Sequence, residues 1–141
     1  MIDVEVFGGT LAPQAPRDLE IARLCTRTAA SRGVASGHVA VEFVDAARIA
    51  RLNRLHRGKE GPTDVLSFPI DGVEALARRE PGGPGDAPPR ELGDIVICPA
   101  HTADVREAIV HGMLHLLGMD HERDAGEMLA AQRELLAESS R

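Results

Sequence analysis

The sequence predicts an α+β fold in which helices pack on a small mixed sheet of four strands. Segments with strand-like and helical patterns follow one another in the order strand, helix, strand, helix, strand, strand, helix, helix. A mixed sheet with helices packed on it accommodates that order. A chain of 141 residues without internal repeats suits one hydrophobic core, so we expect residues 1–141 to form a single domain.

The first strand and the first helix follow from hydrophobic periodicity. Apolar and acidic residues alternate strictly over residues 2–7, as they do in a half-buried strand. The next segment carries Leu19, Ala22 and Cys25 at a spacing of three residues, and a helix there is expected to stop near Gly33. The chain is therefore expected to open with a strand followed by an amphipathic helix.

A second strand leads into a capped helix. Within residues 38–44, the side chains of Val39, Val41 and Phe43 share one face of the strand. The carboxylate of Asp45 can accept hydrogen bonds from backbone N–H groups in a first helical turn. We therefore expect a helix to start immediately after Asp45.

This second helix carries two ladders with a spacing of three residues. The apolar ladder, which we expect to face the core, consists of Ala46, Ile49, Leu52 and Leu55. The basic ladder, on a neighbouring face, consists of Arg48, Arg51, Arg54 and Arg57. Gly58 can adopt the left-handed conformation that ends many helices, so the helix is expected to end there.

The second half of the chain supplies two more strands and two more helices. Residues 65–70 follow a Gly-Pro turn, and residues 95–98 form a short apolar run typical of a buried strand. Between them, seven of the thirteen residues 78–90 are Gly or Pro, which predicts a loop. Helices are expected over residues 102–117 and 122–137.

Composition argues against several classes of function. Aromatic residues make up 2% of the chain, with no Trp or Tyr, which disfavours a platform that stacks single-stranded bases. A net charge of −6 disfavours non-specific coating of nucleic acid. Cys25 and Cys98 fit no CxxC pattern, so we expect two reduced core residues in a cytoplasmic protein. No segment resembles a membrane helix or a secretory signal.

Three histidines in the C-terminal half form the strongest motif. His111, His115 and His121 follow the spacing H-x3-H-x5-H. Residues four apart on a helix lie one turn above each other, so the first two imidazoles can face one point. Gly118 can end the helix and turn the chain so that His121 approaches from outside. The motif therefore predicts a metal site on this helix, with zinc as the expected ion.

The number of ligands indicates what the metal does. A structural zinc usually has four protein ligands, whereas a catalytic zinc keeps one position open for water. Asp120 could be a fourth ligand, but its neighbour His121 already requires the local backbone geometry. Cys98 is distant in sequence. The motif therefore favours a catalytic ion, which lowers the pKa of bound water and acts as a Lewis acid.

One position separates this motif from that of the zinc proteases. Their pattern H-E-x-x-H-x-x-G-x-x-H has a general-base glutamate where this chain has Gly112. Without that carboxylate, hydrolysis of a peptide bond lacks its usual proton acceptor. The sequence therefore disfavours a protease, unless the base comes from elsewhere.

A basic segment indicates the class of substrate. Residues 51–59 hold four formal positive charges and no acidic residue. An arginine ladder is often only a solvated helix face. Arg57 and Lys59 differ, because they flank Gly58 at the helix end, where both can turn toward a cleft. Arginine clamps phosphate through two parallel hydrogen bonds, so a metal beside an arginine suits a phosphodiester.

Several further segments combine with the histidine motif into one pattern. They are residues 52–53 (Leu-Asn), 57–59 (Arg-Gly-Lys), 62–69 (Pro-Thr-Asp-Val-Leu-Ser-Phe-Pro), 92–95 (Leu-Gly-Asp-Ile) and 110–121, in which glycine follows the first histidine. Together they closely resemble the bacterial YbeY endoribonuclease family over nearly the whole chain. His56 and Met119 stand where tyrosine is common, and Glu60 replaces a usual aspartate. None of these departures touches a metal ligand.

The resemblance implies a zincin-like α+β fold and a zinc-dependent endoribonuclease that prefers single-stranded RNA. It implies a role in 3′-end maturation of 16S rRNA and in ribosome quality control. By the same match, His111, His115 and His121 hold one zinc ion and Arg57 is the active-site arginine, while we expect Lys59 to bind substrate. The partners implied are ribosomal RNA, small-subunit ribosomal proteins and a ribosome-assembly GTPase.

Two other functions stay open beside RNA hydrolysis. The first is a non-catalytic ribosome assembly factor, in which the metal is structural and an acidic surface docks a ribosomal protein. The second is an amide hydrolase of the zinc-protease shape. A fourth protein ligand would favour the first, and cleavage of a protein substrate would favour the second.

A few polar residues receive smaller predictions. Thr63 and Asp64 are expected to shape the turn before the third strand, with support of the residues of the site as the alternative. Asp94 is expected in a turn before the fourth strand, although it could instead orient a ligand histidine. His38 and His101 are expected to be solvated or to cap an element.

Overall fold

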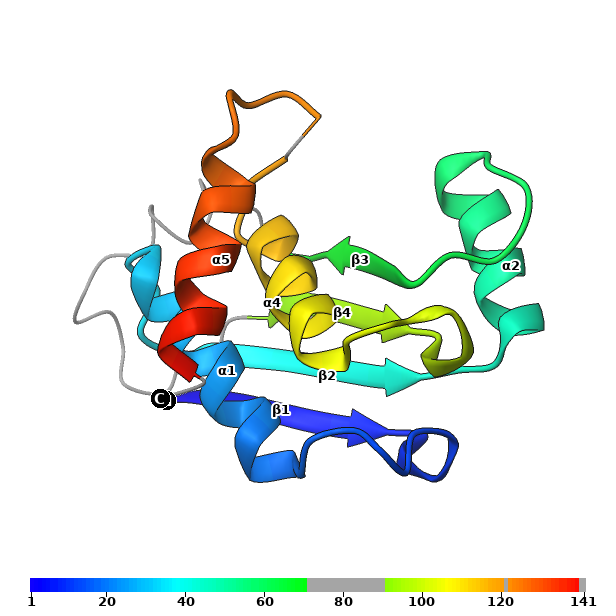
Figure 1. Cartoon of the computed structure of the whole chain (residues 1–141), viewed down its shortest axis with the longest axis horizontal. Helices are drawn as coiled ribbons and strands as arrows, with labels where there is room; N and C mark the ends of the chain where they lie inside the picture. The colour runs from blue at the N-terminus through cyan, green and yellow to red at the C-terminus, as the bar shows by residue number, and fades with distance from the viewer. Residues whose placement is uncertain (71–90, 121, 140–141) are drawn as a thin grey trace.

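Residues 1–70, 91–120 and 122–139 are described by a computed structural model, and they form an α+β fold (Figure 1). The strands are β1 (Ile2–Phe7), β2 (Gly37–Phe43), β3 (Val65–Pro69) and β4 (Glu91–Ile97). The helices are α1 (Asp18–Ser31), α2 (Ala46–Arg57), α4 (Val105–Leu116) and α5 (Glu127–Ser139). Two short 3-10 helices are η1 (Gly9–Leu11) and η2 (Pro99–His101). The predicted α+β class is thereby confirmed, whereas the loop expected over residues 78–90 lies outside the described residues.

The four strands form one mixed sheet in the order β1-β2-β4-β3. Strands β1 and β4 both run parallel to β2, and β3 runs antiparallel to β4. Strand β3 therefore lies at an edge of the sheet. Helix α4 packs across β3 and β4, which brings the histidine-bearing helix next to this edge (Figure 1).

Two apolar clusters cover opposite faces of the sheet. Helices α1, α4 and α5 lie on the larger cluster, to which β3 and β4 contribute Val65, Ile95 and Ile97 (Figure 1). The intervening residues Leu66 and Val96 point the other way and pack with α2. Cys25 is buried in the first cluster and Cys98 in the second, and both are free thiols. Burial raises the pKa of the Cys25 thiol to about 12, so it stays protonated.

The expected inward ladder on α2 was wrong at Leu55, and the residues used to predict α1 include an exposed leucine. Leu55 is 78% exposed and Leu19 is 56% exposed. Each step of three residues falls about 60° short of a full turn, so Ala46 and Leu55 lie on opposite sides of the helix. On α1, the buried face instead follows the mixed spacing of three and four residues typical of amphipathic helices. It consists of Ile21, Leu24, Cys25, Thr28 and Ala29.

The ends of the helices follow from local hydrogen bonds. Asp45 accepts a hydrogen bond from the Arg48 N–H at 2.8 Å, as predicted, and Gly58 ends α2 with φ of 67°. Helix α4 begins at Val105, three residues later than expected, because residues 99–101 form η2 and Asp104 caps the first turn. Helix α5 likewise begins five residues late, at Glu127.

Strand β4 contains the Gly-Asp pair that we expected in a turn. The pairing of β2 with β4 shifts by one residue at Leu92, which forms a β-bulge beside Gly93. Gly93 has φ of 138°, and a Cβ at this position would lie 2.2 Å from the Phe68 carbonyl oxygen. Only glycine fits this close approach of two strands. Asp94 is therefore an exposed strand residue paired with Phe68, and the predicted turn was wrong.

His38 joins three strands rather than being merely solvated, which corrects our expectation. Its Nδ1 lies 2.9 Å from Glu91 Oε2 on β4, and its Nε2 lies 2.7 Å from Glu5 Oε1 on β1. Partial burial lowers the pKa of His38, but hydrogen bonds and charges from Glu91 and Glu5 outweigh that effect and raise it overall. Protonated His38 therefore holds β1, β2 and β4 together.

We expect this link to make stability depend on pH. Because the pKa is raised in the folded state, the stabilisation is complete below the unfolded pKa of about 6.5 and disappears as pH rises through the folded value. His38→Gln should therefore lower the free energy of unfolding more at about pH 6 than at about pH 9. Urea unfolding at both pH values measures this difference. The exposed His101→Gln is the control, and an equal loss for His38→Gln at both pH values would contradict the prediction.

Candidate active site

Helix α4 brings two of the predicted metal ligands together. The Nε2 atoms of His111 and His115 lie 3.2 Å apart, and their rings meet edge to face at 76°. Two nitrogens bound tetrahedrally to one zinc ion at 2.0–2.1 Å would be separated by about 3.3 Å. The observed separation therefore fits a shared metal ion. Two bare nitrogen lone pairs at this distance repel each other, so the pair requires a proton or a cation between them.

The other ring nitrogen of His111 is held by helix α5. His111 Nδ1 lies 2.9 Å from Oε1 of Gln132, which is buried. Gln132 Nε2 in turn donates to Glu107 Oε1 at 3.3 Å. Three residues of α4 and α5 thus form a hydrogen-bonded chain that ends at the histidine pair.

The third predicted ligand, His121, lies outside the described residues. Within residues 1–70, 91–120 and 122–139, no group of three or more His, Cys, Asp or Glu side chains is arranged to hold a metal ion. Cys98 is buried in the cluster beneath α2, on the opposite face of the sheet from the histidine pair. Asp120 accepts a hydrogen bond from the Glu122 N–H at 2.9 Å. The three-histidine site therefore stays a prediction, of which two members are seen to converge.

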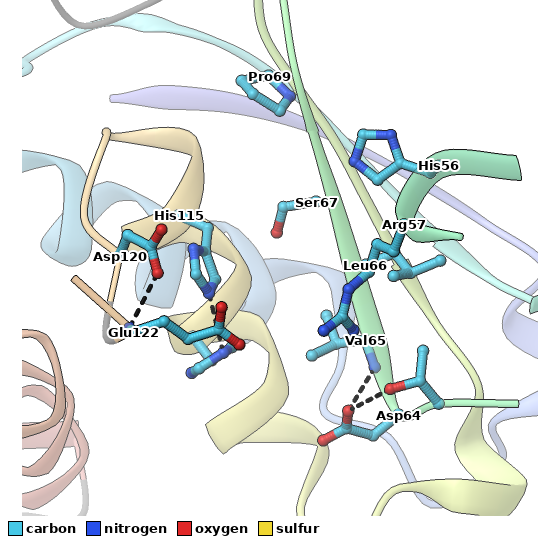
Figure 2. A pocket seen from close by; sticks show the side chains of 12 residues that line it. His56, Arg57, Asp64, Val65, Leu66, Ser67, Pro69, His115, Asp120 and Glu122 are labelled. Atoms are coloured by element: carbon cyan, nitrogen blue, oxygen red, sulfur yellow. Dashed lines mark hydrogen bonds between the residues drawn. The ribbon is translucent and has the colours of Figure 1, made fainter. Parts of the chain in front are cut away.

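A pocket of about 470 Å³ opens beside the histidine pair. Its lining residues are His56, Arg57, Thr63, Asp64, Val65, Leu66, Ser67, Pro69, His111, His115, Asp120 and Glu122. Figure 2 shows His115, Asp120 and Glu122 on one side and His56, Arg57 and Asp64 on the other, with Ser67 of β3 between them. The pocket therefore lies along the edge strand, between the end of α2 and the histidine helix.

The segment that connects α2 to β3 is fixed by its own hydrogen bonds. Buried Asn53 donates from Nδ2 to the Gly61 carbonyl at 2.9 Å. The Asp64 carboxylate accepts from the Val65 N–H at 2.8 Å and from the Thr63 hydroxyl at 3.2 Å. The predicted turn-shaping role of Thr63 and Asp64 is thereby confirmed. These contacts position the end of α2, and hence Arg57, at the mouth of the pocket.

The basic residues of this region divide into two groups. Arg57 lines the pocket, whereas the other three arginines of the ladder are exposed and do not line it. The same 60° drift that exposes Leu55 places Arg57 about half a turn around the helix from Arg48. Lys59 is exposed and is not among the lining residues, so its role in substrate binding stays a prediction.

Three polar pocket residues, His56, Ser67 and Glu122, were not singled out as site residues from the sequence. The Ser67 hydroxyl donates to the Gly112 carbonyl at 3.1 Å, which ties β3 to α4. The ring of His56 packs 4.4 Å from that of Phe68. Glu122 follows His121 directly and adds a carboxylate. His56 and Glu122 each stand next to a predicted site residue in the sequence, and Ser67 lies on the strand face toward α4. These positions were the available signals.

Gly112 faces the sheet, where a side chain has no room. A Cβ on Gly112 would lie 2.7 Å from Cγ2 of Ile95 on β4. The position where zinc proteases carry their glutamate is therefore occupied by the contact between helix and sheet. The absence of the glutamate follows from packing, and the base of any hydrolysis must come from another residue.

We expect Gly112→Glu to unfold the protein rather than create a peptidase. The new carboxylate would be forced against Ile95 and its buried neighbours, which should lower the free energy of unfolding by more than about 3 kcal/mol. Thermal and urea unfolding measure this loss. Gly9→Glu is the control, since no atom lies within 4 Å of a Cβ there. A stable Gly112→Glu protein would show that our account of this packing is wrong.

Comparisons with known proteins identify relatives and a similar fold. The family model described as endoribonuclease YbeY matches residues 18–140. The chain is 44% identical over 113 residues to an endoribonuclease YbeY of Mycolicibacterium vanbaalenii, a match that covers 68% of this chain and 58% of that protein. It is 38% identical over 131 residues to the endoribonuclease YbeY of Bacillus cytotoxicus, covering 82% of each.

The comparisons also give the share of the relatives' length that the chain spans and a solved structure with a similar fold. The chain spans between 58% and 64% of the length of the mycobacterial relatives that it matches. A solution structure of a Thermotoga maritima protein has a TM-score of 0.53 and 24% sequence identity, and covers 99% of this chain and 89% of its own. The likeness to this solution structure concerns the fold alone.

Within the described residues, no helix is long and apolar enough to cross a membrane.

Proposed function

Because the chain belongs to the YbeY endoribonuclease family, we propose that it is a metal-dependent endoribonuclease that hydrolyses single-stranded RNA. The observation that carries the proposal is a single pocket lined by both the paired histidines and Arg57. Imidazole pairs are suited to a metal ion, and a guanidinium is suited to phosphate. A pocket that combines them fits a phosphodiester substrate.

The proposed ion is zinc, held by His111, His115 and His121. The 3.2 Å separation of the first two Nε2 atoms supports a shared ion. Zinc, when bound, supplies Lewis acidity and lowers the pKa of water. Imidazole ligands retain the ion while leaving the site without the charge of a carboxylate ligand, which suits an anionic substrate.

Arg57 is the residue that binds the phosphate group of the proposed substrate. Its guanidinium is always charged and can donate two parallel hydrogen bonds to phosphate oxygens. Negative charge accumulates on those oxygens as the attacking oxygen bonds to phosphorus and the bond from phosphorus to a ribose oxygen breaks, so a fixed donor there stabilises the transition state. The ribose oxygen leaves as a hydroxyl after it takes up a proton. Arg57 can hold its position because it is the last residue of α2, followed by the hydrogen-bonded segment that leads to β3.

Carboxylates in the pocket can take up the proton that the attacking water releases. Asp64, Asp120 and Glu122 line the pocket, and none occupies the position of the protease glutamate. A carboxylate that accepts this proton acts as the general base. The same negative charges repel the RNA backbone, so binding depends on Arg57, on Lys59 nearby and on the ion.

In the cell, we propose that the substrate is ribosomal RNA, with cleavage contributing to 3′-end maturation of 16S rRNA and to ribosome quality control in the cytoplasm. Small-subunit ribosomal proteins and a ribosome-assembly GTPase are the proposed partners. A net charge of −6 supports this view, because basic ribosomal proteins can dock on acidic surface away from residues 51–59. Context on the ribosome would then supply specificity that a chain without Trp or Tyr cannot obtain by stacking bases.

We expect two substitutions in the pocket to abolish or sharply reduce RNA cleavage. His115→Ala removes a proposed metal ligand and should eliminate cleavage of a single-stranded RNA from the 16S rRNA 3′ end. Arg57→Ala should lower kcat by about 100- to 1,000-fold, as loss of one transition-state donor does. Arg54→Ala is the matched control, since this exposed arginine lies on the same helix but does not line the pocket. Gel-based cleavage rates measure all three.

The outcomes separate the competing functions. If the zinc-loaded wild-type protein cleaves no RNA while casein is hydrolysed, the chain is an amide hydrolase. If neither substrate is cleaved and the His115→Ala chain still supports rRNA processing in cells, a non-catalytic assembly role replaces our proposal. Equal rates for Arg57→Ala and Arg54→Ala would remove Arg57 from the catalytic residues.

A further inference from the structure

We propose that Gln132 of α5 is a positioning residue that fixes which nitrogen of His111 faces the metal. This inference deepens the proposed function and rests on it. Gln132 is one of three buried polar residues among the described part of the chain, and only 7% of it is exposed. It lies 21 positions after His111, on a different helix, and both of its amide atoms have partners. A buried amide with two satisfied atoms has a defined orientation.

The orientation follows from the chemistry of Glu107. An ionised carboxylate can only accept hydrogen bonds, so the Gln132 atom that faces Glu107 must be the donor Nε2. The atom that faces His111 is then Oε1, which can only accept. His111 Nδ1 must therefore carry a hydrogen. The reverse orientation would place two acceptor oxygens against each other at the Glu107 end.

This order of donors leaves the lone pair of His111 on Nε2. In a neutral imidazole only one nitrogen carries hydrogen, and the partner of the other nitrogen decides which one. With Nδ1–H held by Gln132, Nε2 of His111 is the acceptor that points at Nε2 of His115, 3.2 Å away. Gln132 thus prepares His111 to bind a metal at the point that the two rings share.

The hydrogen-bonded side chains of Glu107, Gln132 and His111 also couple the site to the packing of α5. Helix α5 contacts α4 and buries Met128 and Leu135, which flank Gln132 at spacings of four and three residues. Those apolar contacts hold the amide against His111. Groups that orient a metal-ligating histidine typically change metal affinity by 10- to 100-fold when they are removed. Detachment of α5 is therefore expected to weaken metal binding without altering a ligand.

Substitutions at Gln132 separate orientation from simple packing. Gln132→Leu keeps a similar volume but removes the acceptor, and we expect its Kd for Zn²⁺ to rise about 10- to 100-fold. The double change Glu107→Gln with Gln132→Glu reverses the two groups yet keeps an acceptor toward Nδ1, so its Kd should stay within about threefold of wild type. Arg133→Leu, at the exposed neighbouring position, controls for a new leucine on α5. Competition with a chelator of known affinity measures each Kd.

A second readout does not depend on the metal. In the metal-free protein, ¹⁵N NMR shifts of the His111 ring should show hydrogen on Nδ1 in wild type and in the double variant, and loss of that preference in Gln132→Leu. The inference is overturned if Gln132→Leu retains both the wild-type tautomer and the wild-type Kd. If wild type has the Nδ1–H tautomer but binds no Zn²⁺, the metal-dependent function fails while the orienting role of Gln132 stands.

Discussion

The close packing of α4 against the sheet at Gly112 is the contact on which the rest of the site depends. Because Gly112 has no side chain, the helix approaches Ile95 of β4 more closely than any other residue would permit. That approach lets the Ser67 hydroxyl reach the Gly112 carbonyl, and it brings His111 and His115 beside the edge strand β3. The histidine helix therefore forms one wall of the pocket and the end of α2 forms the opposite wall, with the edge strand β3 between them.

This packing also decides what chemistry the pocket can perform. The position that would hold a protease glutamate is filled by Ile95, so the carboxylates of the pocket come from Asp64 before β3 and from Asp120 and Glu122 after the histidine helix. On the opposite wall, Arg57 supplies the charge that an anionic substrate needs. We propose that this arrangement favours attack at phosphorus over attack at a peptide carbonyl, as the family to which the chain belongs would lead one to expect.

Local patterns in the sequence predict the order of elements, the caps at Asp45 and Gly58 and the meeting of His111 with His115, because each depends on residues within one helical turn. Features that depend on distant partners were missed. The bulge at Gly93 exists because β3 passes close by, so a Gly-Asp pair that signals a turn lies inside a strand. Gln132 gives no signal of its own, since its contact with His111 arises only when α5 packs on α4.

We propose that RNA cleavage depends on a metal held by His111, His115 and His121. The most direct test is the cleavage rate of single-stranded 16S rRNA 3′-end RNA by protein stripped of metal and then titrated with Zn²⁺. We expect no cleavage by the stripped protein and full recovery at one equivalent of Zn²⁺ per chain. Cleavage that persists at an undiminished rate in the metal-free protein would contradict it.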